Sequence, residues 1–359
     1  KILRLSFVLV IIFSYGLVIY TKENYFGTYI CIKHDILLAL CIVLLLWGRF
    51  VPITFLFLNF ILVEYRAAHG ISTLATTVAC MTTFSLIANN LLTIKNNRNK
   101  SFLSKLDFSV NRYICRIIKP RLLHIYAFTS YAVCSLLAMS LHYQDQTWIR
   151  GYTVGEILSS SYICRFHSVF VWLETKYPFY YHIFSAIIAL FQTLFQTLML
   201  FSLFSKKIFV FTKYWGWIFI INSLVFLQLS YLPFIELILW LSLFHGFSGC
   251  GREFNFSLQI IKNNKTFLAL FIFTILSYIF YHFNFLSKGS ISDSLNFKKL
   301  PNSYNFFKSL GLEYPDVFNT TDLKMSDHWL VLYRTKLNSK IENQNLQSTI
   351  SNTYSNLSQ

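Results

Sequence analysis

Long apolar stretches separated by short polar segments dominate the first 285 residues of the chain. Several of these stretches approach the roughly 20 apolar residues that an α-helix needs to cross a bilayer. Gly48-Arg49-Phe50 separates two short stretches and predicts a tight helical hairpin, while Pro233 separates a later pair. The pattern predicts nine membrane spans, at residues 2–20, 35–47, 51–65, 73–94, 122–141, 180–204, 214–232, 233–247 and 266–285.

The basic residues predict which side of the membrane each connection occupies. Residues 95–121 hold eight Lys and Arg residues against one acid, Asp107, and cytoplasmic loops are enriched in Lys and Arg. Nine spans with the N-terminus inside place every basic connection on the cytoplasmic side. The sequence therefore predicts a multi-pass cell-membrane protein, with residues 142–177 and the C-terminal tail outside the cell.

Three regions of different composition follow one another along the chain. Residues 1–286 are predicted to form an all-α polytopic membrane domain of about nine helices. Residues 287–337 carry mixed charge and a strand-like run at 329–333, and are predicted to form a small extracytoplasmic α+β or irregular cap. Residues 338–359 are mostly Asn, Ser, Gln and Thr, which predicts a disordered polar tail.

Composition excludes an ordinary soluble domain. Hydrophobic residues make up 55% of the chain and charged residues 13%, whereas soluble domains carry about 25% charged residues. The formal net charge of +16 resides in short loops, where it sets topology. The lipid bilayer is therefore the expected partner, and no nucleic acid is expected.

Candidate catalytic residues lie in one span and in the polar segment that begins at residue 142. Glu236 falls inside the span 233–247, where an unpaired carboxylate is costly and is a functional candidate by default. Its alternative role is a hydrogen-bonded packing residue, and His245 is a candidate partner. His142, Tyr143 and Asp145 are the other catalytic candidates, because they combine titratable groups with an interface that supplies water.

Two further groups are candidates for substrate binding. Trp148, Arg150 and Tyr152 continue the outer polar segment, where the rings have the alternative role of an interfacial aromatic belt. A second group lies at the outer end of the third span, where an interfacial ion pair is the simpler explanation. Its members are Glu64, Arg66 and His69.

The cysteines and the missing motifs limit the cofactor chemistry. Cys31 and Cys164 are the two cysteines that the predicted topology places outside, where an oxidising environment permits a disulfide. The sequence has no CxxC, HExxH, Walker loop, GxGxxG or GxSxG motif. No metal site and no cofactor are predicted.

The order of several weak motifs resembles the HTTM domain, the membrane domain shared by vitamin K-dependent gamma-carboxylases and by bacterial proteins like sporulation-delaying protein B. Leu46-Trp47-Gly48-Arg49 is followed by a short span and by Glu64-Tyr65-Arg66. The span ending at residue 141 is followed by Gln146-Thr147-Trp148-Ile149-Arg150-Gly151-Tyr152, and later come Lys206-Lys207 and Leu232-Pro233-Phe234. The resemblance covers roughly residues 3–285.

Departures from the resemblance argue against gamma-carboxylation. The resemblance implies a catalytic lysine ahead of Trp148, but the sequence there is His142-Tyr143-Gln144-Asp145, and no lysine lies between Lys119 and Lys176. Gln196 and Asn222 stand where relatives carry an acid and a histidine, and a neutral amide is not a base near neutral pH.

Three functions remain open from the sequence. The resemblance implies a role in maturing or exporting a secreted peptide toxin, with a small secreted peptide precursor and a companion maturation protein as partners. The alternative is a membrane enzyme that acts on a lipid-soluble, quinone-like substrate, or performs a gamma-carboxylase-like reaction, at the outer interface. A transporter or a structural partner protein is the third, although no internal repeat supports transport.

Overall fold

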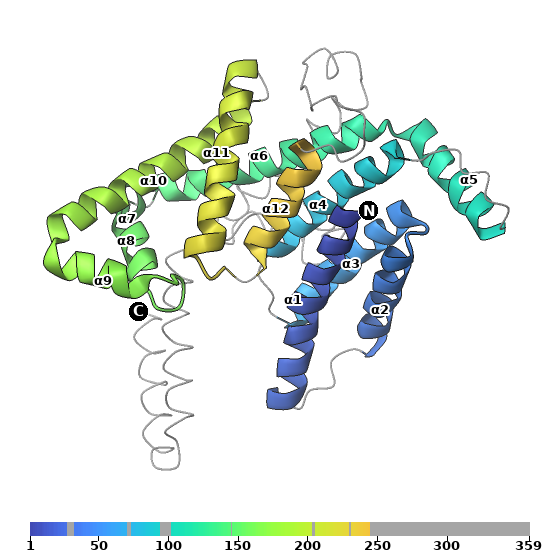
Figure 1. Cartoon of the computed structure of the whole chain (residues 1–359), viewed down its shortest axis with the longest axis horizontal. Helices are drawn as coiled ribbons and strands as arrows, with labels where there is room; N and C mark the ends of the chain where they lie inside the picture. The colour runs from blue at the N-terminus through green and yellow to red at the C-terminus, as the bar shows by residue number, and fades with distance from the viewer. Residues whose placement is uncertain are drawn as a thin grey trace, which may run out of the picture. The chain divides into compact units, whose positions relative to one another are not determined.

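The structure is a computed structural model of the chain, and it describes residues 1–26, 32–69, 73–93, 102–144, 146–202, 205–229 and 231–244. All of them belong to one compact unit, Lys1–Pro315. The described residues are all-helical and form no sheet (Figure 1). The twelve helices are α1 (Ile2–Phe26), α2 (Ile32–Trp47), α3 (Val51–His69), α4 (Thr73–Leu92), α5 (Phe102–Ile117), α6 (Pro120–Gln144), α7 (Gln146–Ile149), α8 (Tyr152–Ser159), α9 (His167–Lys176), α10 (Pro178–Phe201), α11 (Lys206–Phe226) and α12 (Leu232–Phe244).

Helices occupy the predicted spans that fall within the described residues, which confirms the all-α prediction for that part of the chain. Among these helices, α4, α10 and α11 are long and apolar enough to cross a membrane. Helices α1, α2, α3 and α12 each contain a shorter apolar stretch of 10–17 residues. The ninth predicted span, at residues 266–285, lies outside the described residues, as do the predicted cap and polar tail.

Helix α4 is the central helix of the described bundle, where it packs against α3, α6 and α12. In the apolar stretch of α4, 83% of the residues are buried inside the protein, whereas the shares for the apolar stretches of α10 and α11 are 22% and 28%. Small and hydroxyl side chains make this possible, because they let neighbouring backbones approach closely. The Thr82 hydroxyl donates to the Val78 carbonyl oxygen at 2.7 Å, so a buried polar group is satisfied within its own helix.

One end of the bundle gathers the α2–α3 hairpin turn and the start of α1. The guanidinium of Arg4 lies against Gly48 of the turn. The backbone N–H of Phe50, in the same turn, donates to Asp107 Oδ1 of α5 at 2.8 Å. The Asn89 side chain near the end of α4 donates to the Ser242 carbonyl oxygen of α12 at 2.9 Å. We call this the hairpin end.

The far end of α11 lies against the loop that precedes α9. Cys164 and Leu227 form an isolated antiparallel bridge. The Arg165 N–H donates to the Phe226 carbonyl oxygen at 2.8 Å, and the Gln228 N–H donates to the Ile163 carbonyl oxygen at 2.7 Å. These bonds end α11 at Phe226, which corrects the predicted span 214–232, since the chain leaves the helix to pair with this loop.

Two predicted connections contain helices that the apolar pattern does not reveal. Helix α5 lies inside the basic segment 95–121, which the sequence presented as a loop between spans. The polar segment 142–177, which the sequence predicts to lie outside and which we call the outer segment, contains the short helices α7, α8 and α9. Helix α5 was missed because charged and polar residues interrupt its apolar residues, so no continuous hydrophobic run marks it.

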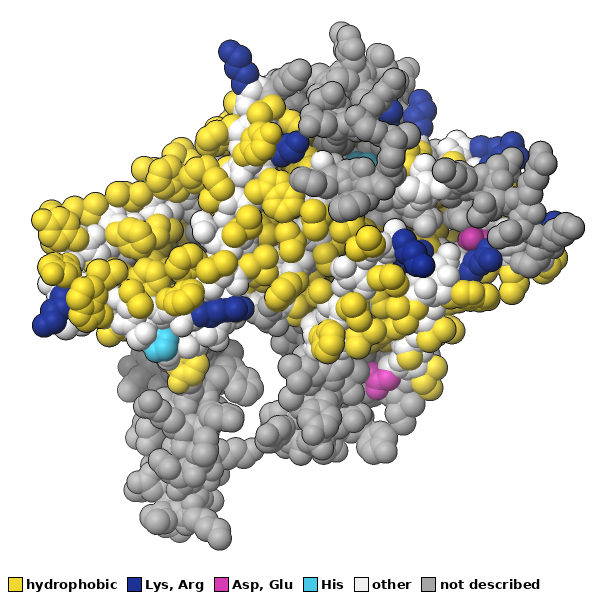
Figure 2. Space-filling model, in the orientation of Figure 1, with side chains coloured by type: hydrophobic (Ala, Val, Ile, Leu, Met, Phe, Trp, Pro, Cys, Tyr) yellow, Lys and Arg dark blue, Asp and Glu magenta, His cyan; other side chains and the backbone are white. Residues whose placement is uncertain are grey.

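Large apolar side chains cover the outward faces of α10 and α11. Figure 2 shows this surface as mostly yellow over the part of the molecule that Figure 1 labels α10 and α11. Its members on α10 include Ile183, Ile187, Leu190 and Leu194, and those on α11 include Phe211, Ile218, Ile221 and Val225. Apolar area of this extent is typical of contact with lipid rather than with water.

Candidate functional site

Glu236 is the only ionisable residue in the sequence of α12, and it lies in the first part of that helix. Its side chain is 5% exposed. The hydroxyl of Tyr131 on α6 donates to Glu236 Oε1 at 2.8 Å, and both groups are buried. This bond joins α6 to α12 in the apolar interior, because a buried carboxylate needs a donor. Tyr131 carried no signal in the sequence beyond being a phenol inside an apolar run.

An aromatic contact extends from this pair toward α11. The rings of Tyr131 and Trp240 meet edge-on with centroids 5.6 Å apart. Trp240 lies one helical turn after Glu236, so both project from one side of α12. The indole Nε1–H donates to the Lys213 carbonyl oxygen of α11 at 3.1 Å. A methyl group added at Gly216 would lie 2.2 Å from the Trp240 ring, so this glycine allows the two helices to approach.

A second set of polar contacts joins α12 and the segment before it to α1 and α4. The ring of Tyr15 lies 6.0 Å from the ring of Tyr231, and its hydroxyl is 3.4 Å from the Thr76 hydroxyl. Near the other end of α12, the Ser242 hydroxyl donates to the Ser85 hydroxyl at 2.6 Å. Glu236, the acid that pairs with the Tyr131 phenol, therefore lies on a helix with contacts near both of its ends, which suits a rigid polar centre.

The outer segment forms a compact layer against α10. Trp148 of α7 is fully buried. Gly151 has φ +83°, and an added Cβ would lie 2.4 Å from the backbone nitrogen of Ala186, so only glycine fits between α7 and α10. The ring of Tyr152 stacks on His182 with centroids 4.5 Å apart. The segment is thus a folded platform and not an open loop.

The candidate binding residues of this segment differ in their exposure. Trp148 is buried within the platform, and its predicted role in substrate binding stays a prediction. Arg150 is exposed, and Tyr152 is exposed on the same platform. Of the three, Arg150 and Tyr152 keep side chains that a partner can reach.

The acid–phenol pair and the outer segment form separate clusters. Tyr131 lies thirteen residues before Gln144, where α6 ends, and a rise of 1.5 Å per residue puts these two positions roughly 20 Å apart along the helix. Beyond that end, the contacts described for Gly151 and Tyr152 are with α10. A single pocket that joins Glu236 to Arg150 is therefore not the arrangement the structure describes.

The remaining candidates are placed only in part. Two candidates lie on the last turn of α6, namely His142 and Tyr143. Three more lie on the last turns of α3, namely Glu64, Arg66 and His69. The side chains of all five are outside the part of the chain that the structure describes. Asp145, His245 and Cys31 lie outside the described residues. Cys164 is buried and has no disulfide partner among the described residues. Because Cys31 is not one of these residues, its predicted disulfide with Cys164 stays a prediction. Among the described residues, no group of three His, Cys, Asp or Glu side chains is arranged to hold a metal ion.

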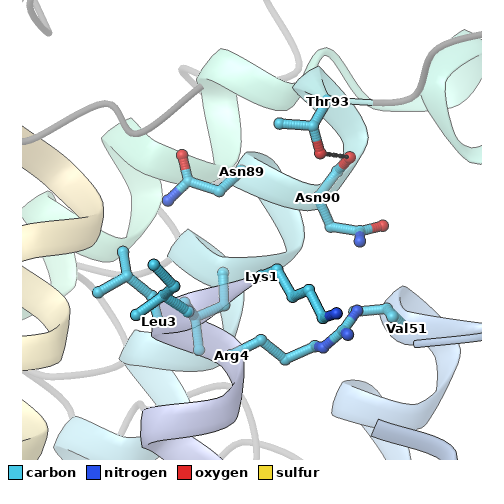
Figure 3. A pocket seen from close by; sticks show the side chains of 9 residues that line it. Lys1, Leu3, Arg4, Val51, Asn89, Asn90 and Thr93 are labelled. Atoms are coloured by element: carbon cyan, nitrogen blue, oxygen red, sulfur yellow. Dashed lines mark hydrogen bonds between the residues drawn. The ribbon is translucent and has the colours of Figure 1, made fainter. Parts of the chain in front are cut away.

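A cavity of about 210 Å³ lies at the hairpin end, between α1, α3 and α4. Figure 3 shows the side chains of Lys1 and Arg4 extending across it, with Asn90 opposite them. The Arg4 Nε is buried and has no hydrogen-bond partner among the described residues. The residues that line the cavity are spread along the chain from Lys1 to Thr93, so no local motif indicated it.

Comparison of the chain with protein-family models, with curated proteins and with solved structures finds no match. The resemblance to HTTM-domain proteins therefore stays a prediction that rests on the order of motifs in this sequence.

Proposed function

We propose that this chain is a multi-pass membrane protein with nine spans, its N-terminus and hairpin end on the cytoplasmic side. The apolar outward faces of α10 and α11 support insertion in a bilayer. The start of α1, the α2–α3 turn and Asp107 of the basic connection lie together, as the positive-inside rule requires of connections on one side. The loop before α9 contacts the other end of α11, in agreement with an external outer segment.

The function that we propose is participation in the maturation or export of a secreted peptide. The observation that carries it is the outer platform, on which Arg150 and Tyr152 are exposed while Trp148 and Gly151 fix the backbone beneath them. Arginine and tyrosine are the side chains that most often dominate protein recognition, particularly on a rigid support. The order of motifs that resembles the HTTM domain points to the same role.

A second candidate function is catalysis on a lipid-soluble, quinone-like substrate. The buried Glu236–Tyr131 pair favours it, since an ionisable residue kept inside an apolar bundle commonly transfers protons or binds substrate. The separation of this pair from Arg150 makes it the weaker candidate, because a substrate at the outer interface would need both clusters. The pair otherwise acts as a structural bond between α6 and α12.

The experiment that separates the two functions is deletion of the gene in its host. Small secreted peptides and lipid extracts are compared by mass spectrometry in the wild type, the deletion strain and a complemented strain. Peptide maturation predicts an accumulated precursor or a lost mature peptide that complementation restores, with an unchanged quinone profile. An unchanged peptide profile would refute the proposal, and a changed quinone profile would favour the enzyme.

A further inference from the structure

Helix α5 presents three different faces. At about 100° per residue, the apolar side chains at 102, 106, 113 and 117 fall in one stripe along the helix. They are strongly exposed, since Phe102 is 77%, Tyr113 64% and Ile117 63% accessible. An exposed stripe of this kind on an otherwise polar helix is typical of a helix that lies in a membrane interface.

The basic side chains of α5 lie along one border of this stripe. Lys105, Arg112 and Arg116 occupy a neighbouring arc of the helix and are all exposed. In a helix that lies parallel to a bilayer, side chains at this border reach the level of the headgroups while the stripe enters the acyl region. Their charge complements anionic phospholipids.

The third face of α5 attaches it to the hairpin end. Asp107 Oδ1 accepts hydrogen bonds from the Phe50 N–H at 2.8 Å and from Asn111 Nδ2 at 3.0 Å. Arg49 Nη1 lies 3.8 Å from Asp107 Oδ2. Asn111 is buried. The attachment fixes the rotation of α5 about its own axis, so the apolar stripe and the basic border remain turned away from the hairpin turn.

We propose that α5 is an interfacial helix that binds the anionic headgroups of the membrane, with its apolar stripe in the acyl region and Lys105, Arg112 and Arg116 on lipid phosphates. The partner is the bilayer surface, because the apolar stripe and the basic border lie side by side along the whole helix. The basic residues of this connection thereby gain a role beyond setting topology.

The test uses the full chain in lipid nanodiscs and follows amide hydrogen exchange of residues 102–117 by mass spectrometry. Discs of phosphatidylcholine alone are compared with discs that contain phosphatidylglycerol, at low and at high salt. Each basic residue near an anionic surface strengthens binding by about fivefold. We therefore expect exchange of α5 to slow at least about fivefold in the anionic discs, and the difference to vanish near 1 M salt, where the Debye length is about 3 Å.

Two variants locate the effect. Lys105→Gln, Arg112→Gln and Arg116→Gln together are expected to abolish the difference between the two lipids. Tyr113→Ser is expected to speed exchange in both lipids, since it shortens the apolar stripe while it leaves the charges in place.

The matched control removes three exposed basic residues elsewhere, by Arg165→Gln, Lys176→Gln and Lys207→Gln. It is expected to keep the lipid dependence of α5. The proposal is overturned if wild-type α5 exchanges equally in both discs, or if the control triple abolishes the difference as fully as the α5 triple. Equal protection in detergent without lipid also overturns it, because the stripe would then be covered by protein.

Discussion

The bond between Tyr131 and Glu236 makes a quantitative prediction about how the bundle is held together. Tyr131→Phe removes the donor and keeps the ring that meets Trp240. The Glu236 oxygen then remains buried without its partner. Glu236→Leu removes the acceptor instead, so the Tyr131 hydroxyl remains in an apolar setting without its partner.

The magnitude follows from the cost of a buried polar group without a partner. Such a group costs about 1–3 kcal/mol, whereas replacing both partners by apolar groups of similar shape is nearly neutral. Hydrogen bonds between membrane helices average about 0.6 kcal/mol and reach about 1.7 kcal/mol. We therefore expect each single variant to lose roughly 1–2 kcal/mol of unfolding free energy, and the double variant to lose less than either one.

The assay is reversible unfolding of the full chain in mixed micelles, followed by circular dichroism as denaturing detergent increases. Tyr180→Phe serves as the control, because Tyr180 is 70% exposed, and it is expected to change the unfolding free energy by less than about 0.5 kcal/mol. If the losses of the two single variants add in the double variant, the two residues do not act as a pair and the reasoning is wrong.

Three further predictions concern single positions. Gly151→Ala is expected to disrupt the outer platform and cost more than about 2 kcal/mol, because its Cβ would meet the α10 backbone, whereas Gly155→Ala meets only side chains at 3.4 Å or more and stays close to wild type in thermal unfolding. Asp107→Ala is expected to cost about 1–2 kcal/mol and to speed amide exchange at Phe50, which loses its acceptor. Burial raises the pKa of the Cys164 thiol. We therefore expect maleimide to label Cys164 in the folded chain at least about tenfold more slowly than in the denatured chain at pH 7.5. Equal labelling rates in the folded and the denatured chain would contradict its burial.

The hydrophobic pattern predicted the helices that contain long apolar runs, because a run of that length has few alternatives to a helix in lipid or in the protein interior. The turn at Gly48 and the helix start at Pro233 followed from local chemistry in the same way. Helix α5 escaped the prediction, since its apolar residues are spaced by three and four and are diluted by charge. The end of α11 was predicted too late because backbone pairing with Ile163, distant in sequence, competes with the helix.

The candidate site was predicted in its parts but not in its arrangement. Glu236 is a single carboxylate in an apolar segment, so the sequence alone marks it as a candidate. Its partner Tyr131 is one of 22 tyrosines, and a sequence does not specify which of them a distant helix brings to the carboxylate. Trp148 was a binding candidate because polar side chains are dense around it in the predicted outer segment. Its burial depends on packing against neighbouring helices, which the sequence does not specify.

The most direct test of the proposed function is the amount of mature secreted peptide made by complemented deletion strains. Arg150→Ala is compared with Arg165→Ala, an exposed arginine of the loop before α9, at matched levels of membrane protein. Peptide recognition by the outer platform predicts that Arg150→Ala lowers the mature peptide at least about tenfold, equivalent to about 1.4 kcal/mol of binding, while Arg165→Ala stays within about twofold of wild type. Equal peptide levels in both variants and the wild type would contradict the assignment of the outer platform as the working surface.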